Sequence, residues 1–326
     1  MSLLSLFKRR PFGTVARPSD EPKAIFVSGV DTSPISADND FIVHDQADAL
    51  QAGFDALTKL TTGKVHLTLH STLNTSKELK GIKGVETHSI SGPHPAGNVG
   101  VQMNHIDPIN KGEVAWSVSI QDVLIIGKAM LTGRFDATRI VAVAGTPANS
   151  PKYFRTVIGA SVRSIANDVA AGSRIISGTV LCGDNVGPEG HLGYFHKEIC
   201  VLPEGDKAKF FITDGWAGMG LKKHSVSKSY LSWLMPSKKY DLDTNMQGEE
   251  RALVVSGQYE SVFPMDILPQ HLLKAIIIKD IELMESLGIY EVDEEDFALC
   301  EYVCTSKTPV QEIVRNGLLF VEKETA

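Results

Sequence analysis

The sequence predicts a chain of mixed α/β and α+β class, built from three parts. Strand and helix patterns alternate over residues 23–137, as they do in βαβ units. Short β-rich segments around one helix occupy residues 138–255, and helical patterns fill residues 256–326. A chain of 326 residues is also longer than one hydrophobic core usually organises. We therefore expect three domains with these boundaries, preceded by a leader or linker over residues 1–22.

The first domain begins with a short apolar run that ends in glycine, which is typical of a buried strand. Its strands are expected at residues 23–29, 64–69 and 85–90. A helix is expected at residues 47–60. An apolar run at residues 114–120 leads into a second helix, expected at 121–131, and Gly133 ends this helix. Strand, helix and strand at this spacing indicate a parallel sheet.

The second domain is expected to be a small mixed module such as a β-grasp fold, because several short strands surround one helix. The strands are expected at residues 139–145, 152–157, 174–180, 198–202 and 208–212. The helix is expected at residues 161–170, and Gly-rich connectors follow at 183–193 and 214–220.

The third domain is expected to be helical, with helices at residues 269–287, 293–303 and 308–316. Asp293 is a suitable N-cap for the second helix, with Asp296 at its third position. Pro309 suits the first turn of the third helix.

Composition and charge exclude several classes of function. The net charge is -7, and nucleic acid binding needs clustered Lys and Arg, so we interpret the one basic group, at residues 8–10, as a solvated end. Four scattered cysteines do not make a disulfide framework. No apolar run reaches the ~18 residues that a membrane-spanning helix needs. These features favour a soluble or peripheral protein of the cytoplasm.

The sequence lacks the loops that hold nucleotides. A dinucleotide site of the usual type needs G-x-G-x-x-G between a strand and a helix, so that backbone amides can approach a pyrophosphate. The first strand instead runs into SGVDT at residues 28–32, and the nearest match, GMG at 218–220, follows no clear strand. His191 and His196 have no carboxylate or cysteine beside them at ligand spacing. We therefore expect neither a nicotinamide nor a metal in this chain.

The most unusual segment is the loop SGPHPAGNVG at residues 91–100. Its prolines fix φ and its glycines permit positive φ, so the loop is shaped rather than flexible. It follows a strand, which is where ligands bind in α/β domains. One hypothesis makes His94 a hydrogen-bonding or proton-transfer group. The other, which the residues alone favour, is a structural turn with an exposed histidine.

Cys300 and Cys304 lie four residues apart and share one face of a helix. A ferredoxin-type four-iron cluster needs four thiolates, commonly as C-x-x-C-x-x-C-x-x-x-C-P. Read backwards from Cys304, the third and fourth cysteines are present, but Phe297 and Glu294 stand at the second and first positions. The pair is half of a cluster motif that this chain cannot complete. We expect two buried structural cysteines that bind no iron.

Residues 283–314 resemble the C-terminal domain of the A subunit of the sodium-translocating NADH:quinone oxidoreductase (Na+-NQR). The related C subunit of the Rnf electron-transfer complex has intact clusters at the matching place. Further segments similar to this family lie at residues 92–97, 115–117, 121–123, 131–133, 155–157, 159–161, 174–178 and 293–296. The resemblance covers nearly the whole chain. Full members of the family carry a further N-terminal segment with a biotinyl-lipoyl-like domain, so this chain is expected to be truncated at its N-terminus.

The resemblance implies a fold and a role. Because the family is similar to the flavin-carrying subunit of complex I, it implies a Rossmann-like domain, a β-grasp domain of the soluble-ligand-binding (SLBB) type and a helical domain with a degenerate iron–sulphur site. It implies a subunit without a cofactor of its own, at the cytoplasmic face of the bacterial inner membrane, that touches the membrane only through partner subunits. Five other subunits would be its partners and would carry FMN, FAD, riboflavin and a 2Fe-2S centre. The implied role is quinone reduction coupled to sodium export, and the isolated chain is expected to be inactive.

Quinone is then the expected substrate of the complex, and a quinone site needs an apolar cleft with one or two polar groups. Our candidates in this chain are the loop residues Gly92, Pro93, His94, Pro95 and Gly97. Two other functions stay open. The α/β domain alone is compatible with a stand-alone flavoprotein that uses FMN and NADH, and the β-grasp domain with a non-enzymatic module that binds a ligand or a partner.

Overall fold

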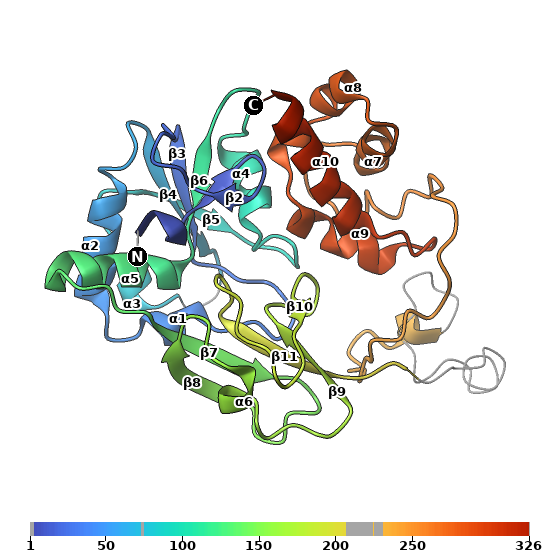
Figure 1. Ribbon diagram of the computed structural model, residues 1–326, viewed down its shortest axis with the longest axis horizontal. Coiled ribbons are helices and arrows are strands. Elements are labelled where there is room, and N and C mark those ends of the chain that lie inside the picture. The colour runs from blue at the N-terminus through green and yellow to red at the C-terminus, as the bar shows by residue number, and fades with distance from the viewer. Residues whose placement is uncertain (1–2, 73–74, 207–223, 225–230, 326) are drawn as a thin grey trace.

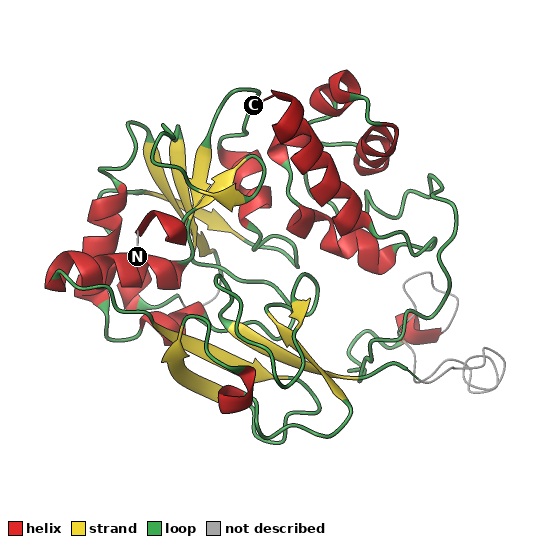
Figure 2. Cartoon of the chain, in the orientation of Figure 1, coloured by secondary structure: helices red, strands yellow, loops and turns green. Residues whose placement is uncertain are grey.

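The computed structural model describes residues 3–72, 75–206, 224 and 231–325. Figure 1 shows a sheet with its helices at the upper left, a second sheet below it and a group of helices at the right. Figure 2 separates the strands of the two sheets from the helices of the third part. The chain is therefore of mixed α/β class, with two sheets and a helical part.

The first sheet has six strands in the order β2-β1-β6-β3-β4-β5. They are β1 (Lys8–Arg10), β2 (Thr14–Val15), β3 (Ala24–Ser28), β4 (Lys64–His70), β5 (Glu86–Ile90) and β6 (Ala115–Ser117). Strands β6, β3, β4 and β5 are parallel, as the alternation of strands and helices predicts, while β1 is antiparallel to both of its neighbours, β6 and β2. The carboxyl ends of the parallel strands therefore share one edge of the sheet.

Residues 1–22 are not the leader or linker that the sequence suggests. Strand β1 pairs with β6, and the 3-10 helix η1 (Leu3–Leu6) places Leu6 in the hydrophobic core. The basic group at residues 8–10 is not a solvated end either, because Arg10 is 2% exposed. The burial of Arg10 cannot be predicted from its neighbours in the sequence, because one of the carboxylates that pair with it lies 285 positions further along the chain.

The first sheet is covered by helices on both faces. These helices are α1 (Asn39–Val43), α2 (Ala47–Leu57), α3 (Lys77–Lys80), α4 (Val99–Ile106) and α5 (Ile120–Thr132). The larger core includes the buried residues of α2 and α5, and a smaller one joins Phe26 of β3 to Met103 of α4. As predicted, Gly133 ends α5, in the left-handed conformation with φ of 68°.

Helices α2 and α5 are in close backbone contact, because each has a glycine where they meet. A Cβ at Gly127 would overlap the carbonyl oxygen of Ala49, and a Cβ at Gly53 would overlap that of Val123. Two helix backbones can approach this closely only where no side chain stands between them.

The second sheet has five strands in the order β10-β9-β11-β7-β8. They are β7 (Thr138–Ala144), β8 (Lys152–Val157), β9 (Ser173–Ser177), β10 (Asp184–Asn185) and β11 (Glu198–Pro203). Strands β11 and β7 are parallel, and the other pairs are antiparallel. The strand expected at residues 208–212 lies outside the described residues.

The helix expected at residues 161–170 is only one turn long, α6 (Val162–Ile165). The prediction was too long because the chain beyond this turn pairs with another segment. Val169 forms a β-bridge with Ala148, and Asn149 donates to the carboxylate of Asp168.

The third part contains α7 (Pro269–Ile278), α8 (Ile281–Ser286), the 3-10 helices η4 (Ile289–Glu291) and η5 (Glu294–Phe297), α9 (Ala298–Val303) and α10 (Val310–Thr325). The helix expected at residues 269–287 is interrupted, because Lys279 adopts a left-handed conformation with φ of 58° and the carboxylate of Asp280 caps α8. Asp293 forms the predicted N-cap, in a capping box with Asp296. Within the described residues, no helix has the length and apolar character to cross a membrane.

The contact between α2 and α5 gives a test of this fold. Gly127→Ala is expected to lower the free energy of unfolding by about 1–3 kcal/mol, because the added Cβ must push Ala49 away. Met130→Ala in the same helix is the control, since Met130 is 53% exposed and its loss is expected to cost less than about 0.5 kcal/mol. Urea titration followed by circular dichroism measures both variants, and equal effects would contradict the close helix contact.

Candidate functional site

The loop at residues 91–98 lies at the carboxyl end of the parallel strands, between β5 and α4. Gln102 of α4 donates to the carbonyl oxygens of Ala96 and Gly97 at 3.3 and 3.2 Å. The same amide donates to the Oγ of Ser28, the last residue of β3, at 2.9 Å. Because Gln102 is 1% exposed, its amide is a buried clamp that fixes the loop to the end of β3.

The imidazole of His94 points from this loop toward the chain that follows β3. The backbone N–H of Gly97 donates to Thr32 Oγ1 at 2.8 Å, and Thr32 Oγ1 lies 3.2 Å from His94 Nδ1. The hydroxyl of Thr32 has a proton of its own, and when it donates that proton to Nδ1 the neutral imidazole carries its proton on Nε2. Nε2 is buried and has no hydrogen-bond partner among the described residues. In this tautomer His94 presents an N–H group without an acceptor.

Charged groups from the first and third parts of the chain act on His94, and the second part contacts one of them. Burial lowers the pKa of His94, although Asp31 and Glu295 act in the opposite direction, so the imidazole is neutral near pH 7. Asp31 forms an ion pair of 2.7 Å with Lys197, which precedes β11 and also donates to Asn39 Oδ1 at 3.0 Å. Burial alone would raise the pKa of Asp31, but Lys197 more than compensates and the pKa is lowered. These contacts hold the second sheet against the edge where the loop lies.

The helical part reaches the loop through the segment around η5. The side chain of Asn98, which precedes α4, donates to the carbonyl oxygen of Glu295 at 3.1 Å. The carboxylate of Asp296 packs against the backbone of α4 at Gly100, where a Cβ would overlap it. Burial raises the pKa of Asp296 to about 7, against the opposing charge of Arg10. The first turn of α4 is therefore in direct contact with η5.

Arg10 of β1 supplies the positive charge for that segment. Its Nη1 lies 3.3 Å from Asp293 Oδ2 and 3.8 Å from Asp296 Oδ2, and its Nη2 donates to Glu295 Oε1 at 2.8 Å. The guanidinium and the Asp296 carboxylate are almost fully buried. Charges in such surroundings are stable only when they are paired, so β1 and η5 depend on one another.

The structure separates the predicted loop residues into two groups. Gly92 and Pro93 are exposed, whereas Pro95 is buried, Gly97 is bound to Thr32, and the imidazole of His94 is directed inward. The expectation of an exposed histidine is therefore wrong, because His94 is half-buried, while the interpretation of the loop as a structural turn stays a prediction.

Sequence reasoning missed four residues of this region. Asp31, Thr32 and Glu295 interact with His94, and Lys197 pairs with Asp31. The first two carried a usable signal, because they follow the first strand and so lie at the same sheet edge as the loop. Lys197 and Glu295 carried none, since they come from other parts of the chain.

Cys300 and Cys304 are both buried, as the sequence predicts. The hydroxyl of Tyr259 donates to Cys304 Sγ at 2.9 Å. Burial raises the pKa of Cys300. Burial also acts to raise the pKa of Cys304, but hydrogen bonds, with that from Tyr259 the largest, outweigh it and the pKa of Cys304 is lowered. Phe297, at the position of a second cluster ligand, is a core side chain, and Glu294 is paired with an arginine of α10. These residues do not fit a cluster that needs four thiolates.

Comparison with known proteins places the chain in a family. A family model described as "NqrA second alpha/beta domain" matches residues 2–135, and one described as "NQRA C-terminal domain" matches residues 140–187. The A subunit of the Na(+)-translocating NADH-quinone reductase of Rhodopirellula baltica is 37% identical over 99% of this chain and 71% of its own length. The protein of the same name from Vibrio atlanticus is 39% identical over 97% of this chain and 70% of its own length. The chain belongs to the NqrA family, the A subunits of Na(+)-translocating NADH-quinone reductases.

A solved structure with similarity to this NqrA-family chain is that of an NAD+-reducing [NiFe]-hydrogenase in the air-oxidized state. The sequence identity is 10% and the TM-score is 0.42, over 93% of this chain and 55% of that chain. The match to the first NqrA family model begins at residue 2, which agrees with the two strands that residues 1–22 add to the first sheet.

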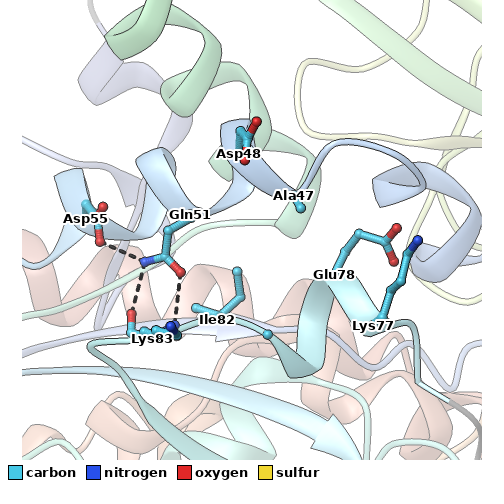
Figure 3. Close-up of a pocket in the computed structure, with 9 residues that line it drawn as sticks. Ala47, Asp48, Gln51, Asp55, Lys77, Glu78, Ile82 and Lys83 are labelled. Atoms are coloured by element: carbon cyan, nitrogen blue, oxygen red, sulfur yellow. Dashed lines mark hydrogen bonds between the residues drawn. The ribbon is translucent and has the colours of Figure 1, made fainter.

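Two surface grooves in the described part of this NqrA-family chain lie away from the loop. The larger, of about 610 Å³, lies between α2 and the segment around α3 (Figure 3). There Gln51 accepts from the backbone N–H of Lys83, donates to its carbonyl oxygen and also donates to Asp55, so its amide is already satisfied. The second, of about 460 Å³, is lined by residues that include Phe41 and Tyr153, whose rings stack at 4.3 Å. Neither groove is lined by residues of the loop.

The Arg10 ion pairs give a second test. Arg10→Ala is expected to lower the free energy of unfolding by about 3–5 kcal/mol, because it leaves the buried Asp296 without a counter-charge and leaves Asp293 with Arg315 alone. Arg17→Ala is the matched control, since the Arg17 side chain is 54% exposed and its pair with Glu322 is expected to contribute less than about 1 kcal/mol. Thermal and urea unfolding of both variants check this, and a mild effect of Arg10→Ala would show that the site does not depend on it.

Proposed function

We propose that this chain works as the peripheral A subunit of a Na+-translocating NADH:quinone oxidoreductase and takes part in the quinone reduction step that is coupled to sodium export. The names of its relatives in Rhodopirellula and Vibrio support the complex, and the coverage of at least 97% of this chain supports its place within that complex. The substrate of the proposed step is a quinone, and its binding group in this chain is the loop at residues 91–98.

The observation that carries the quinone part of the proposal is the buried Nε2 of His94, which has no partner among the described residues and which we propose is the protonated nitrogen. A buried donor without an acceptor costs about 1–3 kcal/mol, and a quinone carbonyl oxygen would relieve that cost. Negative charge builds up on this oxygen during reduction, so the bond strengthens as the reaction proceeds. The lowered pKa of His94 keeps the ring neutral, which makes it a hydrogen-bond donor rather than a proton source.

We further propose that the chain carries no redox cofactor and that five partner subunits hold FMN, FAD, riboflavin and the 2Fe-2S centre. Two features support this. The turn after β3 is closed by Ser28, whose hydroxyl donates to the carbonyl of Val30, rather than by glycines open to a pyrophosphate. The environment of Cys300 and Cys304 offers a phenylalanine where a cluster needs a thiolate.

The proposed placement is the cytoplasmic face of the bacterial inner membrane, with the membrane reached through partner subunits. We interpret the first sheet as Rossmann-like, because helices cover both faces of its parallel strands, and the second as an SLBB-type β-grasp domain. In this interpretation the three domains still meet near residues 137 and 255, as the sequence predicts, and residues 1–22 belong to the first domain.

The absence of a cofactor is tested by the visible absorption spectrum of the purified chain under reducing, oxygen-free conditions. A colourless protein is expected, because neither the turn after β3 nor the Cys300 environment suits a chromophore. A flavin band or a broad iron–sulphur shoulder that co-purifies with the chain would overturn this part of the proposal. Failure of the chain to assemble with the five partners on reconstitution would overturn its assignment to the complex.

The role of His94 is tested in the reconstituted complex. His94→Ala is expected to raise the KM for quinone about tenfold, since it removes one hydrogen bond of about 1–1.5 kcal/mol. NADH oxidation by an artificial acceptor that takes electrons upstream of quinone should stay unchanged.

Two further variants control the His94 experiment. His94→Gln keeps an N–H donor and should retain more quinone affinity than His94→Ala. His44→Ala removes a histidine whose side chain is 68% exposed and should have no effect. Quinone affinity and turnover that are the same in His94→Ala and in the unmodified complex would remove His94 from the site.

A further inference from the structure

His66, Glu86 and His88 form a cluster at the other end of strand β5, away from the loop. In the parallel register His66 of β4 lies beside Glu86 of β5, and His88 follows two residues later, so all three side chains lie on one face of the sheet. Phe26 of β3 lies beside His66 in the same row, and their rings stack at 4.7 Å. The proposed quinone step uses none of these residues.

The ligand atoms of the cluster converge on one point. His66 Nδ1 lies 2.9 Å from His88 Nε2 and 3.6 Å from Glu86 Oε2, and the three atoms all lie within 4.8 Å of one another. In a tetrahedral site with metal–nitrogen bonds of 2.0–2.1 Å, ligand atoms are about 3.3–3.4 Å apart. The two measured separations bracket that value, so small side-chain rotations would bring the three atoms to metal-binding distance.

The choice of ligands selects the class of ion. Two imidazoles and one carboxylate suit zinc and its neighbours among the divalent transition metals, whereas magnesium and calcium prefer oxygen ligands alone. We propose that His66, Glu86 and His88 bind one divalent transition-metal ion of the zinc class. Three protein ligands leave a fourth tetrahedral position for water.

The surroundings support such a site. His66 is 4% exposed and fixed by the ring of Phe26, which limits the motion of the first ligand. Lys64 binds the other oxygen of the Glu86 carboxylate, Oε1, at 2.5 Å and so leaves Oε2 toward the histidines. Strand β5 is the last strand of its sheet, and the Glu86 side chain is 43% exposed, so an ion can enter from solvent.

A bound ion would join β4 to β5. Strand β5 runs directly into the loop that carries His94, so the ion would brace the strand on which the loop depends. The site is distinct from the proposed quinone contact, and either proposal can fail without the other.

The test is a titration of the full chain with Zn²⁺ in competition with a chromophoric chelator. We expect one ion per chain and a rise in thermal unfolding temperature when zinc is added. His88→Ala and Glu86→Gln are expected to weaken binding at least about 10- to 100-fold, the loss that even supporting contacts of metal sites cause. Both residues lie on the open edge strand, so these variants are preferred to changes at the buried His66.

Two control variants separate this site from adventitious binding. His191→Ala removes an exposed histidine, and Cys182→Ser removes the exposed cysteine; both should bind zinc like the unmodified chain. With Co²⁺ in place of zinc, the visible spectrum should show a tetrahedral site without thiolate charge-transfer bands. Zinc binding that survives His88→Ala, that disappears in Cys182→Ser, or that is absent at micromolar zinc would overturn the proposal.

Discussion

The buried guanidinium of Arg10 is the constraint on which the position of the helical part beside the first sheet depends. It belongs to β1, which is paired with β6 in the first sheet, and its partners are the carboxylates of Asp293, Glu295 and Asp296 around η5. Buried ion pairs add little net stability compared with apolar contacts, but breaking one is costly. A shift of the helical part would leave a charge unpaired. These ion pairs therefore fix the position of the helical part relative to the first sheet.

That position gives the loop its rigidity. Gln102 holds the loop to β3, the side chain of Asn98 ties its end to Glu295, and Thr32 lies within hydrogen-bond distance of the imidazole of His94. The second sheet is joined to the same edge through the ion pair of Asp31 and Lys197. The loop and the imidazole of His94 are therefore oriented before any ligand arrives, so ligand binding does not carry the entropy cost of ordering them.

The sequence predicted the regular elements well where periodicity and caps are local. The parallel strands, the end of α5 at Gly133 and the capping box of Asp293 followed from neighbouring residues. The prediction failed where the residue that determines the surroundings of a side chain lies far away in the sequence. Arg10 looked like a solvated end because nothing nearby shows its carboxylates, and His94 looked exposed because Thr32 is 62 positions away. The long helix expected after residue 268 broke at Lys279, since a left-handed lysine has no sequence signature.

The distance between Arg10 and its partners along the chain has a consequence for synthesis on the ribosome. Strands β3, β4 and β5 all lie within residues 24–90, so they can pair once that part of the chain has emerged. Strand β1 emerges before all of them, yet its guanidinium has no counter-charge until residues 293–296 have been translated. The charges around Arg10 can therefore be paired only after η5 has been made, whereas the middle strands of the sheet need no such partner. The final environment of β1 thus depends on a segment made long after β1 itself.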